Sequence, residues 1–153
     1  MSQTDQFIEV NRPVSTVYNQ YTQFEEFPRF MEGVERVHQI RDDLLHWVVE
    51  IGGKRREFDA KITEQIPEKR IAWTSTDGKT TSGVVTFHYV DPQKTRVAVQ
   101  MSYDPEGIAE NVADWLGIVS ARVKGDLQRF KEFVENRPQE TGAWRGEIRE
   151  PGR

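Results

Sequence analysis

The sequence predicts an α+β fold in which a curved antiparallel sheet of about seven strands surrounds one long C-terminal helix. Between Ile108 and Asn136, apolar residues recur at steps of three, four or seven, which is typical of a helix with one buried face. From Val34 to Tyr103, apolar and polar residues alternate, which is typical of strands with one face in water. Because one helix has to cover most of this sheet, we expect the sheet to curl around it. The functional question is then what fills the rest of the interior.

The N-terminal part is predicted to be a strand followed by short helical segments. The strand covers residues 3–10, and Pro13 indicates the start of a helix because proline is tolerated in the first helical turn. Pro28 interrupts the apolar pattern that follows, so we expect either two short helices or one broken helix that ends near Gly33. The apolar positions of these segments are Val14, Val17, Tyr18, Tyr21, Phe24, Phe27, Phe30 and Met31.

Six further strands are predicted between Val34 and Tyr103. Gly52-Gly53, Asp77-Gly78 and Asp91-Pro92 have the composition of tight turns and separate several of them. Within each strand every second residue is apolar, and these residues are expected to face the helix. The apolar face includes Trp47, Val49, Phe58, Trp73, Val85, Phe87, Met101 and Tyr103.

The long helix is predicted over residues 108–136, a length of about 43 Å at about 1.5 Å per residue. We therefore expect residues 1–136 to form one domain. Residues 137–153 are rich in proline, glycine and charge, and they are expected to form a polar tail in which Trp144 is a candidate for docking onto the domain.

Composition argues against several classes of function. The net charge of -4 does not suit a general nucleic-acid binder, which needs a basic surface to neutralise phosphates. No apolar run is long enough for membrane insertion, and the polar N-terminus shows no signal peptide, so a cytoplasmic protein is expected. With no cysteine, disulfides, thiolate nucleophiles and cysteine-ligated zinc are excluded.

The three histidines do not form a recognisable catalytic or metal-binding pattern. His38, His46 and His88 fall in separate predicted strands, and the last two lie in the polar phase of theirs. Because metal sites need several ligands at close spacing, neither a metal nor another cofactor is predicted. A Ser-His-Asp arrangement would need a histidine in the interior, and only the orientation of His38 is left open by the pattern.

Four segments carry a resemblance to a known family. They are FEEFPRFM at 24–31, TEQIPEKRIAW at 63–73, GVVTF at 83–87 and DLQRFKEFVE at 126–135. Together with the order of predicted elements, these segments resemble the bacterial polyketide cyclase/dehydrase-like group. This group belongs to the START/Bet v 1-like (SRPBCC) superfamily, which also includes lipid-transfer domains and coenzyme Q-binding proteins. The tail sequence TGAWRGE at 141–147 also resembles members of this group.

The resemblance covers most of the chain and implies a helix-grip fold with a hollow interior. It assigns no catalytic residue, because the polar pocket residues used by the cyclases cannot be matched to positions here. The side chains that we expect to line a pocket share the apolar strand phase or the apolar helix face. They are Trp47, Arg56, Phe58, Trp73, Phe87, Met101, Tyr103, Trp115 and Val119.

Arg56 is the polar member of this set. It shares the strand phase of Phe58, so it is expected either to meet an anionic or carbonyl-bearing ligand or to reach water beside the Gly52-Gly53 turn. Tyr89 and Tyr103 could donate hydrogen bonds into the pocket or pack at its rim. Any one of the aromatic residues could also be ordinary core.

The favoured hypothesis is a protein that binds a hydrophobic or aromatic small molecule, such as a lipid, polyketide or quinone, between the sheet and the helix. The alternative is a polyketide aromatase/cyclase or dehydratase, which would require an acid or base on the inner face. A third alternative is a protein-binding module, which would require an exposed apolar patch on the outer face of the sheet or near Trp144. No oligomeric state is predicted.

Overall fold

The computed structural model describes residues 2–51, 53–76, 81–103 and 112–149. Within these ranges the chain forms one antiparallel sheet, two α-helices and one 3₁₀ helix, so the predicted α+β class is confirmed. The elements are β1 (Ser2–Val10), α1 (Val14–Tyr21), η1 (Phe24–Arg29), β2 (Val34–Arg41), β3 (Leu44–Ile51), β4 (Lys54–Ile66), β5 (Arg70–Ser75), β6 (Thr81–Asp91), β7 (Lys94–Tyr103) and α2 (Val112–Glu135). The predicted helix start at residues 108–111 lies outside the described residues.

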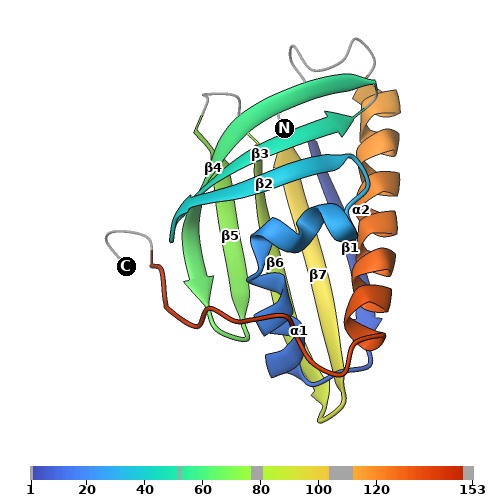
Figure 1. Ribbon diagram of the computed structural model, residues 1–153. Helices are drawn as coiled ribbons and strands as arrows, with labels where there is room; N and C mark the ends of the chain where they lie inside the picture. Colours follow the sequence, from blue (N-terminus) through green and yellow to red (C-terminus); the bar gives the residue numbers. More distant parts are fainter. Residues whose placement is uncertain (1, 52, 77–80, 104–111, 150–153) are drawn as a thin grey trace.

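The seven strands follow the order β1-β7-β6-β5-β4-β3-β2, and every neighbouring pair is antiparallel. β4 is 13 residues long and changes register between Ile62 and Glu64. Such a bulge bends a strand and increases its twist, which helps β4 to pass from one side of the curl to the other. As a result β2, β3 and the first part of β4 fold over in front of β5, β6 and β7 (Figure 1).

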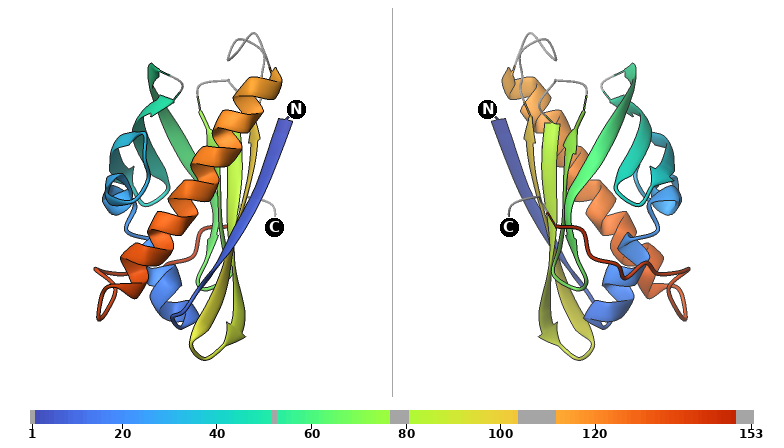
Figure 2. Two further views of the ribbon diagram at one scale, coloured as in Figure 1. Left: turned by 90° about the vertical axis from the view of Figure 1, so that its right-hand side faces the viewer. Right: turned by 90° about the vertical axis from the view of Figure 1, so that its left-hand side faces the viewer.

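Helix α2 closes the open side of this curled sheet. Figure 2 shows it running diagonally along the sheet, with β2–β4 on one side and β1 and β7 on the other. Lys131 Nζ donates to the carbonyl of Glu9 at 3.0 Å, and the backbone N–H of Asn11 donates to the Glu135 carboxylate at 2.7 Å. These contacts fix the C-terminal end of α2 against the junction of β1 and α1.

The interior beside α1 and η1 is solidly packed with aromatic rings. Tyr21 lies at the centre, with its ring centroid 5.7 Å from that of Phe87, 5.1 Å from Phe27 and 5.4 Å from Phe130, all in edge-to-face arrangements. Such pairs add to the stabilisation that comes from burying their area. The two predicted short helices thus form, and they supply part of this cluster: Tyr18, Tyr21, Phe24, Phe27, Phe30, Phe87 and Phe130, each less than 9% exposed.

The C-terminal segment docks on the domain instead of trailing into solvent. β3 pairs with β4 only as far as Lys61, which leaves the later edge of β4 free. Ile148 uses this edge: its backbone exchanges two hydrogen bonds with Gln65, of 2.7 and 2.9 Å. Trp144 donates its backbone N–H to the Thr22 hydroxyl at 3.1 Å. Residues 140–148 therefore cross from α1 to the edge of β4, as Figure 1 shows.

One backbone position in the β4–β5 turn is tied to this segment. Glu68 has a φ of +63°, a left-handed conformation that favours glycine. Its carboxylate accepts a hydrogen bond from Arg145 at 2.6 Å, and Arg145 also donates to Asn19 at 2.6 Å. Arg145 therefore joins the turn to α1. A glycine at position 68 would have no carboxylate to accept this hydrogen bond.

Candidate functional site

The inner face of the sheet changes character from one end to the other. The pairing register places Trp73 opposite both Ile62 and Gly83, and it places Met101 opposite both Gly83 and Thr4. This row marks one end of the sheet, which we call the Trp73 end. The aromatic core around Tyr21 lies toward the other end. The long strands hold both regions on one continuous surface.

Burial differs between these two regions. Ile71, Val85 and Val97 on the inner face are at most 2% exposed. At the Trp73 end, by contrast, Trp47, Phe58, Trp73 and Met101 are all only partly buried, although they share the same face. Large apolar side chains that face inward and still remain accessible indicate that the space opposite them is incompletely filled by the described residues.

Three of these side chains form a nearly parallel group that we call the aromatic panel, made of Trp47, Phe58 and Trp73. The Trp47 and Phe58 rings come from paired positions on β3 and β4; their planes differ by 3° and their centroids lie 6.1 Å apart. Trp73 on β5 lies 6.4 Å from Trp47 with an interplanar angle of 29°. The panel places a stacked group of aromatic rings on one wall of the site, and its Trp47 ring also packs 5.6 Å from Phe27 of the aromatic core.

A missing side chain allows Trp73 to lie close to the sheet. A Cβ atom built on Gly83 would lie 2.9 Å from each of three atoms of the Trp73 indole, Cε2, Cζ2 and Nε1. Real Cβ contacts are not this short, so the indole occupies space that any other residue at position 83 would need. Gly83 therefore provides the notch in which Trp73 rests.

Two nitrogen atoms in this region are buried without a hydrogen-bond partner among the described residues. They are Nε of Arg56 and Nε1 of Trp47. Arg56 pairs with Val49 across β3 and β4, next to the pair of Trp47 and Phe58, so all four side chains share the inner face. A buried donor without a partner is costly, and both atoms could be satisfied by an acceptor oxygen of a ligand.

A pair of hydroxyl groups was not anticipated from the sequence. Thr4 on β1 and Ser120 on α2 lie 2.7 Å apart through their side-chain oxygens, and Thr4 is 4% exposed. They connect α2 to the sheet beside Met101, which pairs with Thr4. In the sequence, the only indication of this contact was that Ser120 directly follows Val119 of the apolar helix face. Nothing in the polar start of the chain pointed to Thr4.

The structure brings most of the predicted pocket residues together. Trp47, Arg56, Phe58, Trp73 and Met101 share the inner face at the Trp73 end. Val119 of α2, which is 7% exposed, directly precedes Ser120 and so lies in the turn of α2 that contacts Thr4.

The remaining predicted residues lie elsewhere or cannot be placed. Phe87 is separate: it is 5% exposed and packs 5.2 Å from Tyr18 in the aromatic core. The side chains of Tyr103 and Trp115 lie outside the described residues. Tyr89, considered as a hydrogen-bond donor, is 64% exposed near the end of β6 and does not face the site.

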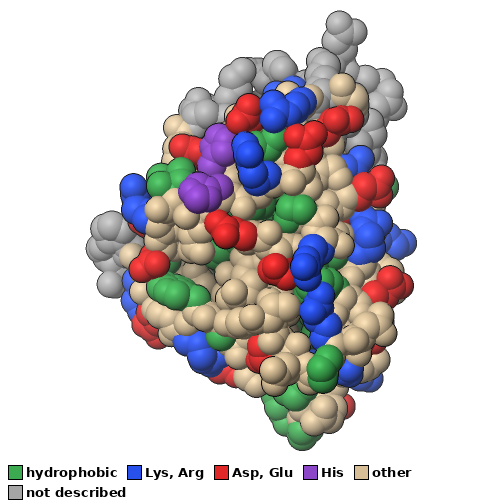
Figure 3. Space-filling view, viewed as in Figure 1, with side chains coloured by type: hydrophobic (Ala, Val, Ile, Leu, Met, Phe, Trp, Pro, Cys, Tyr) green, Lys and Arg blue, Asp and Glu red, His purple; other side chains and the backbone are tan. Residues whose placement is uncertain are grey.

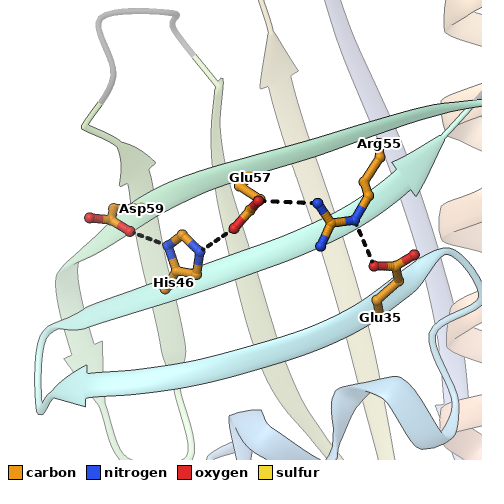
Figure 4. A network of polar contacts seen from close by, with 5 residues as sticks. All are labelled: Glu35, His46, Arg55, Glu57 and Asp59. Atoms are coloured by element: carbon orange, nitrogen blue, oxygen red, sulfur yellow. Dashed lines mark hydrogen bonds and ion pairs between the residues drawn. The ribbon is translucent and has the colours of Figure 1, made fainter.

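The charged cluster on β2, β3 and β4 lies on the opposite, outer face. His46 contacts Asp59 at 2.7 Å and Glu57 at 3.1 Å, and Arg55 links Glu57 to Glu35 with two contacts of 3.1 Å (Figure 4). The hydrogen bonds to Asp59 and then to Glu57 raise the pKa of His46. Since Glu57 and Asp59 flank the inward-facing Phe58, this network is behind the panel and not in the site.

A second charged group fixes α2 to the segment after η1. Asp126 accepts hydrogen bonds from Arg129 at 2.5 Å and from the backbone N–H of Glu32 at 3.0 Å. Arg129 also donates to the carbonyl of Phe30 at 2.9 Å. Burial raises the pKa of Asp126 to about 6, and the neighbouring Arg129 offsets this only in part. These contacts position the helix that forms the second wall of the site.

The outer surface shows fewer features of a ligand-binding site than the inner face at the Trp73 end does. Figure 3 shows acidic and basic side chains interspersed over the face formed by β2–β4 and α1. A groove of about 530 Å³ at the C-terminal end of α2 is lined by Arg29, Arg129, Glu132, Phe133, Asn136, Arg137 and Pro138. Two of its arginines already contact acids, Arg29 with Glu26 and Arg129 with Asp126.

The described part of the chain was also compared with the requirements of a metal site and of a membrane-spanning helix. There, no cluster of three or more His, Asp or Glu side chains is arranged to hold a metal ion. Likewise, none of the helices in the described ranges combines the length and the hydropathy needed to cross a membrane.

Solved structures with the same fold come from several bacteria. A START superfamily protein from Mycobacterium smegmatis superposes with a TM-score of 0.76 at 13% identity, covering 88% of this chain and 97% of that one. The Zhui aromatase/cyclase from Streptomyces sp. R1128 gives a TM-score of 0.74 at 14% identity, covering 94% and 99%. At these identities the likeness establishes the fold.

Sequence comparison gives a nearer relative and a family. An uncharacterized 17.2 kDa protein from the melC2–rnhH intergenic region of Streptomyces lincolnensis is 54% identical over 149 residues, which is 97% of this chain and 99% of that protein. The family model described as polyketide cyclase / dehydrase and lipid transport matches residues 10–132, from the end of β1 to the last turns of α2. The chain therefore belongs to the polyketide cyclase / dehydrase and lipid transport family.

Proposed function

We propose that this protein binds a flat, largely hydrophobic small molecule with at least one acceptor oxygen, between the aromatic panel and the first half of α2. The observation that carries the proposal is the contrast along one sheet face. The side chains around Tyr21 are buried from solvent, whereas Trp47, Phe58 and Trp73 remain partly accessible on the same face of the sheet. Family membership supports the proposal, because the family description includes lipid transport.

The physical basis of binding would be burial of the ligand against the panel. Removing apolar surface from water contributes about 25 cal/mol per Å², so a ligand that covers the panel gains most of its affinity there. Orientation would come from the unpartnered N–H groups of Arg56 and Trp47, which both require an acceptor. A molecule with an aromatic or conjugated ring system and a carbonyl or carboxylate group meets both requirements.

We favour binding over catalysis because of the groups that the site offers. The inner-face positions of the strands, as far as the structure describes them, hold no His, Asp or Glu. Among the described polar groups of the site, the Arg56 guanidinium and the hydroxyls of Thr4 and Ser120 are poorly suited to general acid–base catalysis. This favours a carrier or sequestering role, with polyketide cyclisation or dehydration as the alternative.

The proposal can be tested in two steps on the full-length protein. Native mass spectrometry of protein purified from its own cells should show an added mass that is lost under denaturing conditions. Isothermal titration calorimetry with benzoate, 2-naphthoate and anthraquinone-2-carboxylate should show binding of the larger ring systems. Trp73→Ala should weaken that binding about tenfold or more, a loss of about 1.4 kcal/mol or greater.

The matched control is Phe7→Ala, which removes a 65% exposed aromatic ring from the outer face of β1. Because this ring does not face the interior, its loss should leave the affinity unchanged. An unliganded mass together with no binding of any probe would overturn the proposed function. Equal losses in the two variants would show that the probes bind exposed rings and not this site.

A further inference from the structure

We infer that the Trp73–Gly83 pair sets the depth of the ligand site and thereby determines the largest ring system that the protein accepts. The inference rests on the proposed function and adds a residue that determines specificity. Gly83 does not line the site itself. It acts by allowing the Trp73 indole to lie against β6, which leaves room for a ligand in front of it.

The first argument is that Gly83 is not required by its backbone. Among the described glycines, Gly33 and Gly53 have positive φ values of +88° and +80°, which explains why glycine is present there. Gly83 does not share this conformation, and it pairs regularly with Trp73 of β5 and Met101 of β7, the two neighbours of β6. Glycine inside a strand weakens it, and a common reason for it is the close approach of another group.

The second argument is that the approaching group is identified. Three indole atoms of Trp73 lie 2.9 Å from the position of a Cβ on residue 83, so even alanine would displace the ring. These three atoms belong to a rigid ring system, so the clash cannot be relieved by rotating the end of a flexible side chain. Substitution at position 83 is therefore transmitted directly to Trp73.

The third argument concerns the direction of that displacement. On the β4 side, Trp73 pairs with Ile62, which is 1% exposed, and the backbone of β6 lies beneath the ring. The Trp47 ring, 6.4 Å away, limits movement on another side, and Trp73 is only partly buried, so the remaining direction is away from the sheet into the accessible space. A displaced indole would thus enter the volume assigned to the ligand and reduce its depth.

The test compares ring sizes in four full-length proteins: wild type, Gly83→Ala, Trp73→Leu and the double variant. Calorimetry with 2-naphthoate and anthraquinone-2-carboxylate gives the ratio of the two dissociation constants for each. Gly83→Ala should weaken the three-ring probe about tenfold relative to the two-ring probe. Trp73→Leu should shift the ratio in the opposite direction, and the double variant should lose the effect of Gly83→Ala because the clashing ring is absent.

Ser82→Ala is the matched control, since it creates alanine at the neighbouring position of β6, where the side chain points to the other face. Its ratio should equal that of the wild type. If the wild-type protein binds the probes but Gly83→Ala and Trp73→Leu leave the ratio unchanged, this inference fails and the proposed function stands. If the wild-type protein binds no probe, both fail. Should Gly83→Ala not fold, the Trp73→Leu ratio alone decides.

Discussion

Gln20 and Thr141 satisfy each other through two hydrogen bonds that join α1 to the C-terminal segment. The backbone N–H of Thr141 donates to Gln20 Oε1 at 2.9 Å, and Gln20 Nε2 donates to the Thr141 hydroxyl at 3.0 Å. Gln20 is 0% exposed, so its carboxamide depends entirely on protein partners. The segment after α2 thus completes the polar interior of the domain.

Gln20→Ala should therefore destabilise the protein although it removes no apolar core residue. The substitution leaves the Thr141 N–H without its partner and opens a small cavity, and the combined cost is expected to be about 2–3 kcal/mol. Urea unfolding measures it. Gln128→Ala on the exposed face of α2 is the control and should cost less than about 0.5 kcal/mol. Similar costs for both variants would contradict a structural role for the docked segment.

Asp126 is expected to make stability depend on pH in the acidic range. Its pKa is about 6 in the folded protein, above the ordinary value of 3.8. A carboxyl with a raised pKa binds its proton more tightly in the folded state. Its contribution is therefore fully present below about pH 4 and is lost as the pH rises through about 6, by an amount of about 1–3 kcal/mol.

Asp126→Asn should remove this pH dependence. The amide cannot ionise, yet its oxygen can still accept the hydrogen bond from the Glu32 N–H. Unfolding free energies measured from pH 4 to 7 should fall more steeply with pH in the wild type than in the variant. The exposed control Asp42→Asn should retain the wild-type slope. Parallel curves for wild type and Asp126→Asn would show that Asp126 ionises normally.

The outer-face network predicts a second titration that is independent of ligand binding. Asp59 and Glu57 raise the pKa of His46, so its proton stabilises the fold below about pH 6.5, and this contribution disappears as the pH rises through the higher folded pKa. Because the network is largely solvent-exposed, the effect on stability should be small.

NMR titration of the His46 ring protons is the direct measurement. The Asp59→Asn/Glu57→Gln double variant should lower the pKa of His46, because it removes both acidic hydrogen-bond partners. Probe affinity at the panel should stay unchanged, since the network lies on the other face of β3 and β4. A change in affinity on protonation of His46 would mean that the two faces are coupled.

The sequence predicted the fold well because each of its two periodicities extends over many residues. Strict alternation in β4 separated Phe58 from Glu57 and Asp59 correctly, and the helical pattern placed Leu127 and Phe130 in the core. It could not distinguish a pocket wall from solid core, since Phe87 and Trp73 occupy the same strand phase. That difference depends on the rings that α1 places against Phe87, which is a non-local property of packing.

The docked tail shows a second limit of reading the chain by composition. Residues 137–149 have the proline, glycine and charge of a linker, and only Trp144 suggested an attachment. The actual partners are the free edge of β4 and the buried Gln20, neither of which a local pattern reveals. Similarly, the hydroxyl pair of Thr4 and Ser120 joins residues that are 116 positions apart.

Substitution of Arg56 should change the stability of the unliganded protein and its affinity for a ligand in opposite directions. Its Nε is buried without a partner among the described residues, which disfavours the unliganded protein. Arg56→Met keeps the apolar stem and removes the unsatisfied donor, so the unliganded protein should become more stable by about 1 kcal/mol or remain unchanged. The same variant should bind anthraquinone-2-carboxylate about tenfold more weakly than the wild type, because the charged donor that meets the acceptor oxygen is lost.

The comparison with an uncharged probe shows whether Arg56 acts through its charge. Anthraquinone-2-carboxamide should lose less affinity than the carboxylate on Arg56→Met, since a hydrogen bond to a neutral acceptor is weaker than one to an ion. Arg55→Met, on the outer face of the same strand, is the control and should change neither affinity. A stable Arg56→Met protein that binds both probes as tightly as the wild type would exclude Arg56 from ligand recognition and leave the panel as the sole determinant of affinity.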